Sequence, residues 1–235
     1  MDELRSYDAS TPGSGAREVL VLAGGDPVTL PLVRPLPVVT SVVAADGGYA
    51  TAEVLGVEVD LLVGDLDSIT PEALARAGDQ GVRIERHPVD KDRTDLALAL
   101  DAVLVDGPAN VTLVGGHGGR LDHLLANVAL LAAPEYAPLR ITALLGPAVV
   151  TVVRDRAELT GTPGELLSLL AVHGPARGVT TAGLRFPLDA AVLPVGSSRG
   201  VSNTFTGHSC RIEVADGVLL AVQPGPTDTT PPTHD

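Results

Sequence analysis

The feature that most constrains this chain is a repeated alternation of short apolar runs with helix-like stretches, which stops near residue 147. The runs are rich in Val and Leu and show little polar alternation, which is typical of strands buried on both faces. The pattern predicts βαβ units, and therefore a mostly parallel sheet with helices on both faces. The expected strands are 18–22, 38–44, 59–63, 82–86, 111–114 and 141–145, and the expected helices are 48–55, 71–77, 94–105 and 121–132.

Beyond residue 147 the helical pattern disappears and short strands follow one another, at 149–153, 166–171, 178–180, 190–193, 210–214 and 218–222. Asp216-Gly217 predicts a tight hairpin between the last two strands. We therefore expect an α/β domain with a mostly parallel sheet over 17–147 and a small all-β sandwich domain over 148–224. The polar segments 1–16 and 225–235 are predicted to be disordered tails.

Composition narrows the class of protein. Apolar residues make up 45% of the chain and charged residues 19%, which suits a globular core. Sixteen basic residues against 29 acidic ones give a net charge of −13, which argues against binding to nucleic acid or to an anionic membrane. The single cysteine, Cys210, cannot form an internal disulfide and is predicted to be buried. No segment resembles a signal peptide or a membrane span, so a cytoplasmic location is expected.

Aspartates follow several of the expected strands. Ligands bind beyond the carboxyl ends of the strands in open parallel sheets, so these residues should meet in one crevice. So many carboxylates repel one another, by roughly 4 kcal/mol for two charges about 4 Å apart, unless a cation joins them. Mg²⁺ bound to Asp65 and Asp67 with substrate phosphates fits this pattern, and Gly47 and Gly48 allow close backbone approach. The four segments are Asp46-Gly47-Gly48, 64–69, 90–95 and 115–123.

Other signals leave alternatives open. A single Asp after a strand is often a turn former or a helix cap. Lys91, the only lysine, could contact a phosphate or be a solvated loop residue. The stretch 115–119 matches neither common glycine-rich phosphate motif, and the histidines nearby lack the partners of a zinc site. Ser202 and Asn203 could simply cap a turn, and Phe205 could stack on a flat or cationic ring.

Taken together and in order, the four aspartate-containing segments and Gly200-Val201-Ser202-Asn203 resemble the thiamine pyrophosphokinase family, over residues 19–222. The resemblance implies an ATP-binding α/β domain and a thiamine-binding β-sandwich. It also implies a homodimer with each active site at the subunit interface, and transfer of pyrophosphate from ATP to thiamine with Mg²⁺ as cofactor.

The resemblance also implies roles for individual residues. Asp65, Asp67 and Asp95 would hold Mg²⁺, while Asp46 and Asp92 would shape the same acidic crevice. Contacts with nucleotide or acceptor would come from Thr94, Arg120 and Asp122. Thiamine would be held by Ser202 and Asn203 of the partner subunit, with Phe205 where some members have a tryptophan. Candidates for taking the hydroxyl proton are Asp46, Asp92, Asp122 and a positioned water.

Three other functions compete with this interpretation. One is a pyrophosphokinase with another hydroxyalkyl acceptor, such as a pterin. Another is a phosphatase of the haloacid dehalogenase type, suggested by Asp65 and Asp67 but disfavoured because no lysine follows Lys91 in the chain. The third is a module that senses a nucleotide or Mg²⁺ without turnover.

Overall fold

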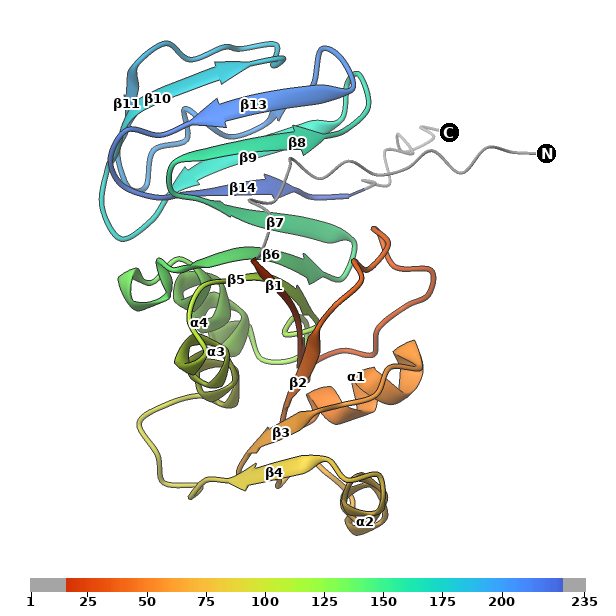
Figure 1. The fold of residues 1–235 in the computed structure, drawn as a ribbon. Helices are drawn as coiled ribbons and strands as arrows, with labels where there is room; N and C mark the ends of the chain where they lie inside the picture. The colour runs from red at the N-terminus through yellow and green to blue at the C-terminus, as the bar shows by residue number, and fades with distance from the viewer. Residues whose placement is uncertain (1–15, 226–235) are drawn as a thin grey trace, which may run out of the picture.

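The computed structural model describes residues 16–225 of the chain and is organised around a long twisted sheet (Figure 1). Among the described residues this sheet has ten strands in the order β12-β9-β14-β7-β6-β5-β1-β2-β3-β4. The half from β6 to β4 is parallel, as the sequence predicts. Its strands are β1 (Arg17–Ala23), β2 (Ser41–Ala45), β3 (Leu61–Gly64), β4 (Arg83–Arg86), β5 (Ala109–Val114) and β6 (Leu139–Leu145).

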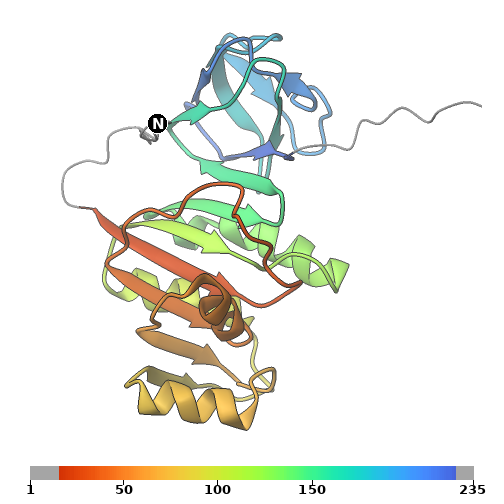
Figure 2. The same cartoon turned by 90° about the vertical axis from the view of Figure 1, so that its right-hand side faces the viewer.

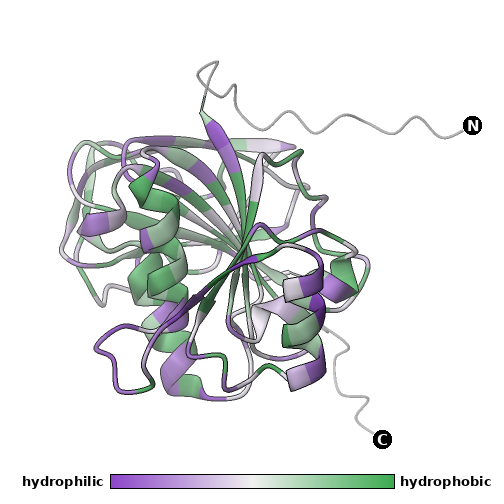
Figure 3. Cartoon of the chain, turned by 60° about the horizontal axis from the view of Figure 1, so that its bottom comes forward, coloured by the Kyte–Doolittle hydropathy of each residue, from purple (hydrophilic) through white to green (hydrophobic). Residues whose placement is uncertain are grey.

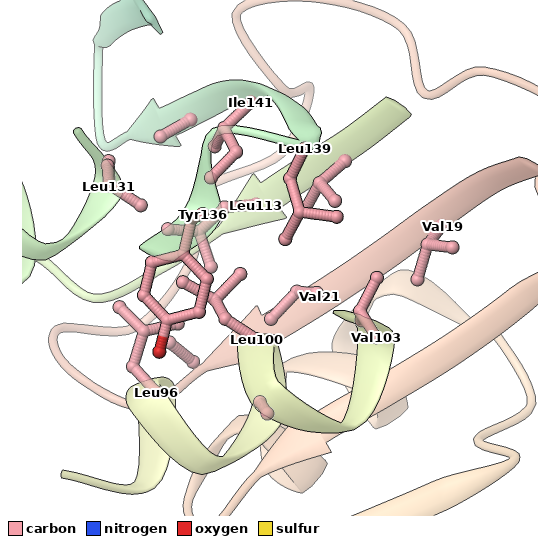
Figure 4. Packing of buried hydrophobic residues seen from close by; sticks show 14 of the residues in the cluster. Val19, Val21, Leu96, Leu100, Val103, Leu113, Leu131, Tyr136, Leu139 and Ile141 are labelled. Atoms are coloured by element: carbon pink, nitrogen blue, oxygen red, sulfur yellow. The ribbon is translucent and has the colours of Figure 1, made fainter. Parts of the chain in front are cut away.

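Helices cover both faces of the parallel half. Successive residues of a strand point to opposite faces, and β1 is apolar on both. Val19 and Val21 pack against α3 (Asp95–Val105) and the end of α4 (Leu121–Leu131), as Figure 4 shows for the α3 side. Leu20 and Leu22 pack on the other face with residues of α1 (Gly48–Leu55) and α2 (Pro71–Asp79). A single 3₁₀ turn, η1 (Pro134–Tyr136), follows α4 and buries the Tyr136 ring in the same core.

Two helices begin at threonine caps. The hydroxyl of Thr70 accepts a hydrogen bond from the amide of Ala73 at 3.2 Å, and Pro71 follows at the first helical position. Thr94 caps α3 in the same way, through the amide of Ala97 at 3.2 Å. As a consequence α3 begins at Asp95, directly beside the ends of β2 and β3.

The second half of the chain forms a β-sandwich, the part at the top of Figure 2. One layer is the rest of the long sheet, built from β7 (Ala148–Val153), β14 (Leu219–Gln223), β9 (Leu166–Ala171) and β12 (Asn203–Thr204). The other layer has β11 (Ala191–Leu193), β10 (Ala176–Ala182), β13 (Ser209–Glu213) and β8 (Arg156–Thr160). Cys210 is buried between the layers with Phe205 and Ile212, which confirms that it is a core residue.

Two expectations need correction here. The predicted hairpin across Asp216-Gly217 is wrong, because β13 pairs with β10 and β8 whereas β14 pairs with β7 and β9. The turn therefore carries the chain from one layer of the sandwich to the other, and both strands find partners elsewhere. Strands β8 and β12 were also not predicted, since β8 is largely polar and β12 is only two residues long.

The alternation of strands and helices stops near residue 147, in the turn between β6 and β7, where the sheet switches from parallel to antiparallel pairing. The long sheet continues across this turn, so the two predicted domains share one sheet; the boundary itself stays a prediction. The predicted tails lie almost entirely outside the described residues. Figure 3 shows hydrophobic colour in the strands at the centre of the molecule and in the helices on its left side. None of the helices within 16–225 is long and apolar enough to cross a membrane.

Candidate active site

Three carboxylates meet where β2 and β3 end. Asp46 follows β2, and Asp65 and Asp67 follow β3; each offers an oxygen, and these oxygens lie within 4.8 Å of one another. Asp46 is buried, at 8% exposure, while Asp65 is half-buried and Asp67 exposed. The Oδ1 atom of Asp46 has no hydrogen-bond partner among the described residues. A buried carboxylate oxygen with no donor, beside two further carboxylates, suits a hard cation that binds oxygen.

The backbone is bent to bring these side chains together. Asp46 adopts a positive φ of 43° and Leu66 one of 66°, which is uncommon for residues other than glycine. Gly64, the last residue of β3, has a φ of +148° and, having no side chain, leaves space beside it for Asp46 and Asp95. A Cβ on Gly64 would lie 2.9 Å from Oδ1 of Asp95 and 3.0 Å from Cβ of Asp46. The absence of a side chain at Gly64 is therefore what lets Asp95 approach the edge that carries Asp46.

Lys91 links the triad to Asp95. Its ammonium nitrogen lies 2.7 Å from Oδ2 of Asp65 and 3.0 Å from Oδ1 of Asp95, and its side chain is only 12% exposed. The hydrogen bond from Lys91 holds the pKa of Asp65 below its ordinary value, against the opposing effect of burial. Burial also opposes the charge of Lys91, but the two ion pairs outweigh it and raise its pKa. This arrangement favours the interpretation of Lys91 as a site residue over that of a solvated loop residue.

The Asp92 side chain is exposed and borders a small hollow with Arg93, Thr94 and residues of α3 and α4. Residues 90–93 form an irregular turn, so nothing in the backbone directs Lys91 and Asp92 to the same side. That Asp92 shapes the acidic crevice stays a prediction. Thr94 acts in the structure as the cap of α3.

Glycine-rich loops surround the end of β1. The amide of Asp26 donates to the carbonyl of His117 at 2.9 Å, and the amide of Gly116 donates to the carbonyl of Gly24, also at 2.9 Å. A Cβ on Gly48 would lie 2.1 Å from the carbonyl oxygen of Leu22, so α1 begins against β1 itself. Segments 24–26, 47–48 and 115–119 therefore pack together as one floor beside the triad. The first of them was missed by the sequence analysis, although the rule applied to the other strand ends would have found it.

Arg120 and Asp122 form an exposed pair at the start of α4. The guanidinium donates to both carboxylate oxygens of Asp122, and the two side chains are 71% and 64% exposed. The hydrogen bond from Arg120 lowers the pKa of Asp122 to about 2. As long as this pair is intact, Asp122 is a weak base and is poorly suited to take the proton of a hydroxyl.

The predicted thiamine residues lie at the opposite end of the long sheet. Ser202 has a positive φ of 58° and is exposed, and its amide donates to the hydroxyl of Ser168 at 3.0 Å. Asn203 is buried and clamps the backbone of Phe186 from both sides: its Oδ1 accepts from the Phe186 amide at 3.0 Å, and its Nδ2 donates to the Phe186 carbonyl at 2.8 Å. Asn203 therefore fixes the loop that carries Phe186.

Phe186, rather than Phe205, is the aromatic residue that this region presents to its surroundings. The Phe205 ring is 2% exposed within the sandwich core, and a Cβ on Gly161 would approach it to 2.8 Å. Such burial contradicts the expectation that Phe205 stacks on a ligand. Phe186 is 59% exposed, and the guanidinium of Arg185 lies 5.3 Å from its ring centre. The sequence signal for Phe186 was available, since the chain has only two phenylalanines.

The two groups of predicted residues are far apart within one chain. Seven inter-strand steps separate β12, which carries Asn203, from β2, which precedes Asp46. At about 4.8 Å a step this corresponds to ~30 Å along the sheet. Figure 1 shows the separation, with β3 and β4 at one end of the molecule and the sandwich at the other.

Both halves of the chain match family models from the same family of known proteins. A family model described as "Thiamin pyrophosphokinase, catalytic domain" matches residues 38–143, and one described as "Thiamin pyrophosphokinase, vitamin B1 binding domain" matches residues 152–219. The thiamine pyrophosphokinase of Bacillus subtilis is 25% identical over 189 residues, which cover 77% of this chain and 86% of that protein. Thiamine pyrophosphokinase 1 of Oryza sativa subsp. japonica is 26% identical over 164 residues, but the match spans only 61% of its length.

Solved structures share the fold. The crystal structure of the Bacillus subtilis thiamine pyrophosphokinase superposes with a TM-score of 0.76 at 23% identity, covering 90% of this chain and 100% of the other. The thiamin pyrophosphokinase of Candida albicans superposes with a TM-score of 0.73 at 14% identity, covering 88% and 89%. Because the two family models account for both the parallel half and the sandwich, the chain belongs to the thiamine pyrophosphokinase family.

Proposed function

We propose that this protein transfers the pyrophosphate group of ATP to the hydroxyl group of thiamine, giving thiamine diphosphate and AMP. The observation that carries the proposal is the triad of Asp46, Asp65 and Asp67, formed at the carboxyl ends of two parallel strands in a chain that matches both family models. The hydroxyl oxygen attacks the β-phosphorus, the bond from that phosphorus to the oxygen bridging to the α-phosphate breaks, and AMP leaves with that oxygen. The hydroxyl proton is released to a base or to water.

The acidic edge is proposed to hold Mg²⁺. Asp46, Asp65 and Asp67 would be its ligands, because their oxygens already converge and one buried oxygen of Asp46 has no donor. Asp95, expected from the family to be a ligand, is held beside the triad by Lys91 and stays a proposed one. When bound, Mg²⁺ offsets the negative charge of the phosphate oxygens.

The nucleotide is proposed to lie over the glycine floor next to the triad. Helix α1 begins there at Gly48 without a side-chain cap, so its amino end favours a negatively charged group. Gly47 and Gly48 allow the phosphates to approach the backbone closely. Arg120, exposed beside the same floor and paired only at the surface, can turn from Asp122 to a phosphate, where a bidentate guanidinium is effective. Thr94 contributes by fixing the start of α3.

We propose that the active unit is a homodimer in which each site combines two chains. The ~30 Å between Asn203 and the triad along the sheet is too long for one thiamine to reach both groups in one chain. A second copy could place its Ser202 and Phe186 beside the first copy's triad. Phe186 would then stack on the cationic ring of thiamine, on a loop that Asn203 holds in place.

The exposed face of α4 is the surface that we propose the second copy covers. This helix is apolar nearly all round, yet of its residues only Leu131 is buried. Leu121 and Leu125 are 67% and 62% exposed, although they lie one turn apart on a helix that starts at the glycine floor. A partner subunit that delivers its thiamine-binding loop to this floor would pass over them.

An assay with ATP, Mg²⁺ and thiamine tests the proposed reaction. Equal amounts of AMP and thiamine diphosphate are expected; production of ADP or free phosphate, or an absence of turnover, would contradict it. Asp67→Asn is expected to abolish turnover with little loss of stability, because it removes one of several mutually repelling carboxylates. Near-normal kcat of this variant at saturating Mg²⁺ would remove Asp67 from the metal site.

A mixing experiment tests the shared site. Asp67→Asn damages only the phosphate half and Phe186→Ala only the thiamine half, so a mixed dimer contains one undamaged site. Exchanged mixtures of the two variants should recover up to roughly a quarter of wild-type activity, the share expected when half of the dimers are mixed and each has one intact site. No recovery in mixtures shown to contain mixed dimers would indicate that each chain builds its site alone.

No specific contact in the described residues favours a pyrophosphokinase with another acceptor, and none favours a sensor without turnover. A cytoplasmic location, where ATP and Mg²⁺ are available, is retained as part of the proposal.

A further inference from the structure

Lys91 forms an ion pair with a carboxylate that the proposed metal site also needs. Its ammonium lies 2.7 Å from Oδ2 of Asp65, and Asp65 is a member of the triad with Asp46 and Asp67. The second partner of Lys91 is Asp95, at 3.0 Å. With a side chain only 12% exposed, Lys91 is held inside the site rather than beside it. The acidic edge therefore already contains one positive charge of its own.

A divalent ion at the triad and the ammonium of Lys91 would repel each other across Asp65. In the absence of nucleotide, the ammonium is paired with Asp65 and Asp95. A triphosphate changes this, because it brings several negative oxygens to which a compact, flexible ammonium can turn. Departure of Lys91 from Asp65 then frees carboxylate oxygen for the metal.

We propose that Lys91 is an internal counterion which competes with the divalent ion for Asp65 and moves to the nucleotide phosphates when these arrive. The inference rests on the proposed metal site and states how metal and nucleotide binding depend on each other. The metal alone binds weakly, and metal and nucleotide strengthen each other's binding. While the site is empty of ligand, Lys91 keeps the carboxylates of Asp65 and Asp95 together. A purely structural link between β3 and α3 would not make metal binding depend on the nucleotide.

The first test measures the affinity of Mn²⁺ by the electron paramagnetic resonance signal of the free ion, without nucleotide. Lys91→Met should bind Mn²⁺ at least tenfold more tightly than the wild type. Arg76→Gln is the matched control, because it also removes one positive charge, from an exposed pair with Glu53 on α1. Its Mn²⁺ affinity should stay within about twofold of wild type. Unchanged or weaker Mn²⁺ binding by Lys91→Met would overturn the inference.

The same titration with α,β-methylene-ATP, whose α–β bridge cannot be cleaved in this reaction, measures the coupling. The analogue should strengthen Mn²⁺ binding in the wild type, and this gain should fall at least tenfold in Lys91→Met. If the wild type fails to bind Mn²⁺ even with the analogue, the proposed metal site itself is wrong. If the wild type binds Mn²⁺ with the analogue but Lys91→Met shows the same coupling, only the role of Lys91 is wrong.

A second measurement needs no substitution. Because Lys91 is the only lysine, reductive methylation with ¹³C labels one side chain besides the terminal amine, and methylation keeps the positive charge. The dimethyl-lysine resonance should change little when Mg²⁺ is added alone and should shift when Mg²⁺ and α,β-methylene-ATP are added together. A resonance that stays in place with both present would overturn the inference, even if Lys91→Met cannot be folded.

Discussion

Replacing Gly64 with alanine is expected to disable the acidic edge while leaving the protein folded. The new methyl carbon would lie 2.9 Å from Oδ1 of Asp95 and 3.0 Å from Cβ of Asp46, where ordinary contacts are 3.4–4 Å. At least one of these side chains must therefore move by roughly 0.5 Å, which is the limit within which catalytic groups need to be held. A displacement approaching 1 Å can lower the rate by about a hundredfold.

The same substitution also strains the backbone, because Gly64 has a φ of +148°. A non-glycine residue in such a conformation costs about 1–3 kcal/mol. For a chain of this size each kcal/mol lowers Tm by about 2–4 °C, so a fall of about 2–12 °C is expected. Calorimetry gives the stability change, and kcat with the affinity for Mn²⁺ gives the effect on the site.

Gly56→Ala separates the two effects. Gly56 ends α1 with a positive φ of 66°, but a Cβ there would meet nothing within 4 Å. This variant should lose about 1 kcal/mol of stability through its backbone alone and keep the kcat of the wild type. If Gly64→Ala also retained more than half of the wild-type kcat and its metal affinity, the close approach of Asp46 and Asp95 would not matter for function, and the reasoning about the site would be refuted.

Three further predictions concern other parts of the molecule. Phe186→Ala should raise KM for thiamine far more than KM for ATP, whereas Phe205→Ala should lower stability by about 3–5 kcal/mol through loss of core packing; equal changes of both KM values in Phe186→Ala would exclude stacking. Leu125→Asp should shift the protein from dimer to monomer in light scattering and abolish turnover, and a fully active dimer would exclude α4 from the interface. Because Asp65 has a pKa below its ordinary 3.8 in the folded protein, the stability it contributes is present above that value and is lost as the pH falls through the lowered pKa. Urea unfolding from about pH 6 to pH 3 should show this loss in the wild type, and a similarly steep loss in Lys91→Met would mean that the ion pair is not its cause.

The parallel half of the fold was predictable because its signals are local. Apolar runs of strand length, caps such as Thr70 and Thr94, and the proline after Thr70 each act within a few residues. The strand pairing of the sandwich was harder to predict, because the partners of short strands are set by packing between residues far apart in the chain. Asp216-Gly217 carries the local signature of a hairpin, yet the strands on either side of it pair in different layers.

The candidate site was predictable as a location but not as an arrangement. That aspartates after β2 and β3 gather at one edge follows from the geometry of parallel sheets, and Asp46, Asp65 and Asp67 do so. The pairing of Lys91 with Asp65 and Asp95 could not be predicted from sequence, because an irregular turn has no period that sets the direction of its side chains. The sequence also could not show which of Phe205 and Phe186 is exposed, since exposure is decided by the packing of two sheets around them.

The sequence by itself determined the alternation of strands and helices in the parallel half, the negative charge, and the aspartates carried by strand ends, since these depend on residue type and on neighbours along the chain. Only the tertiary structure decided that Lys91 lies between Asp65 and Asp95, that Gly64 leaves space for Asp95 beside Asp46, and that β12, which carries Asn203, is ~30 Å along the sheet from the triad. The physical reason is that these relations join residues distant along the chain. Their spacing is set by packing of the whole sheet, which no local pattern records.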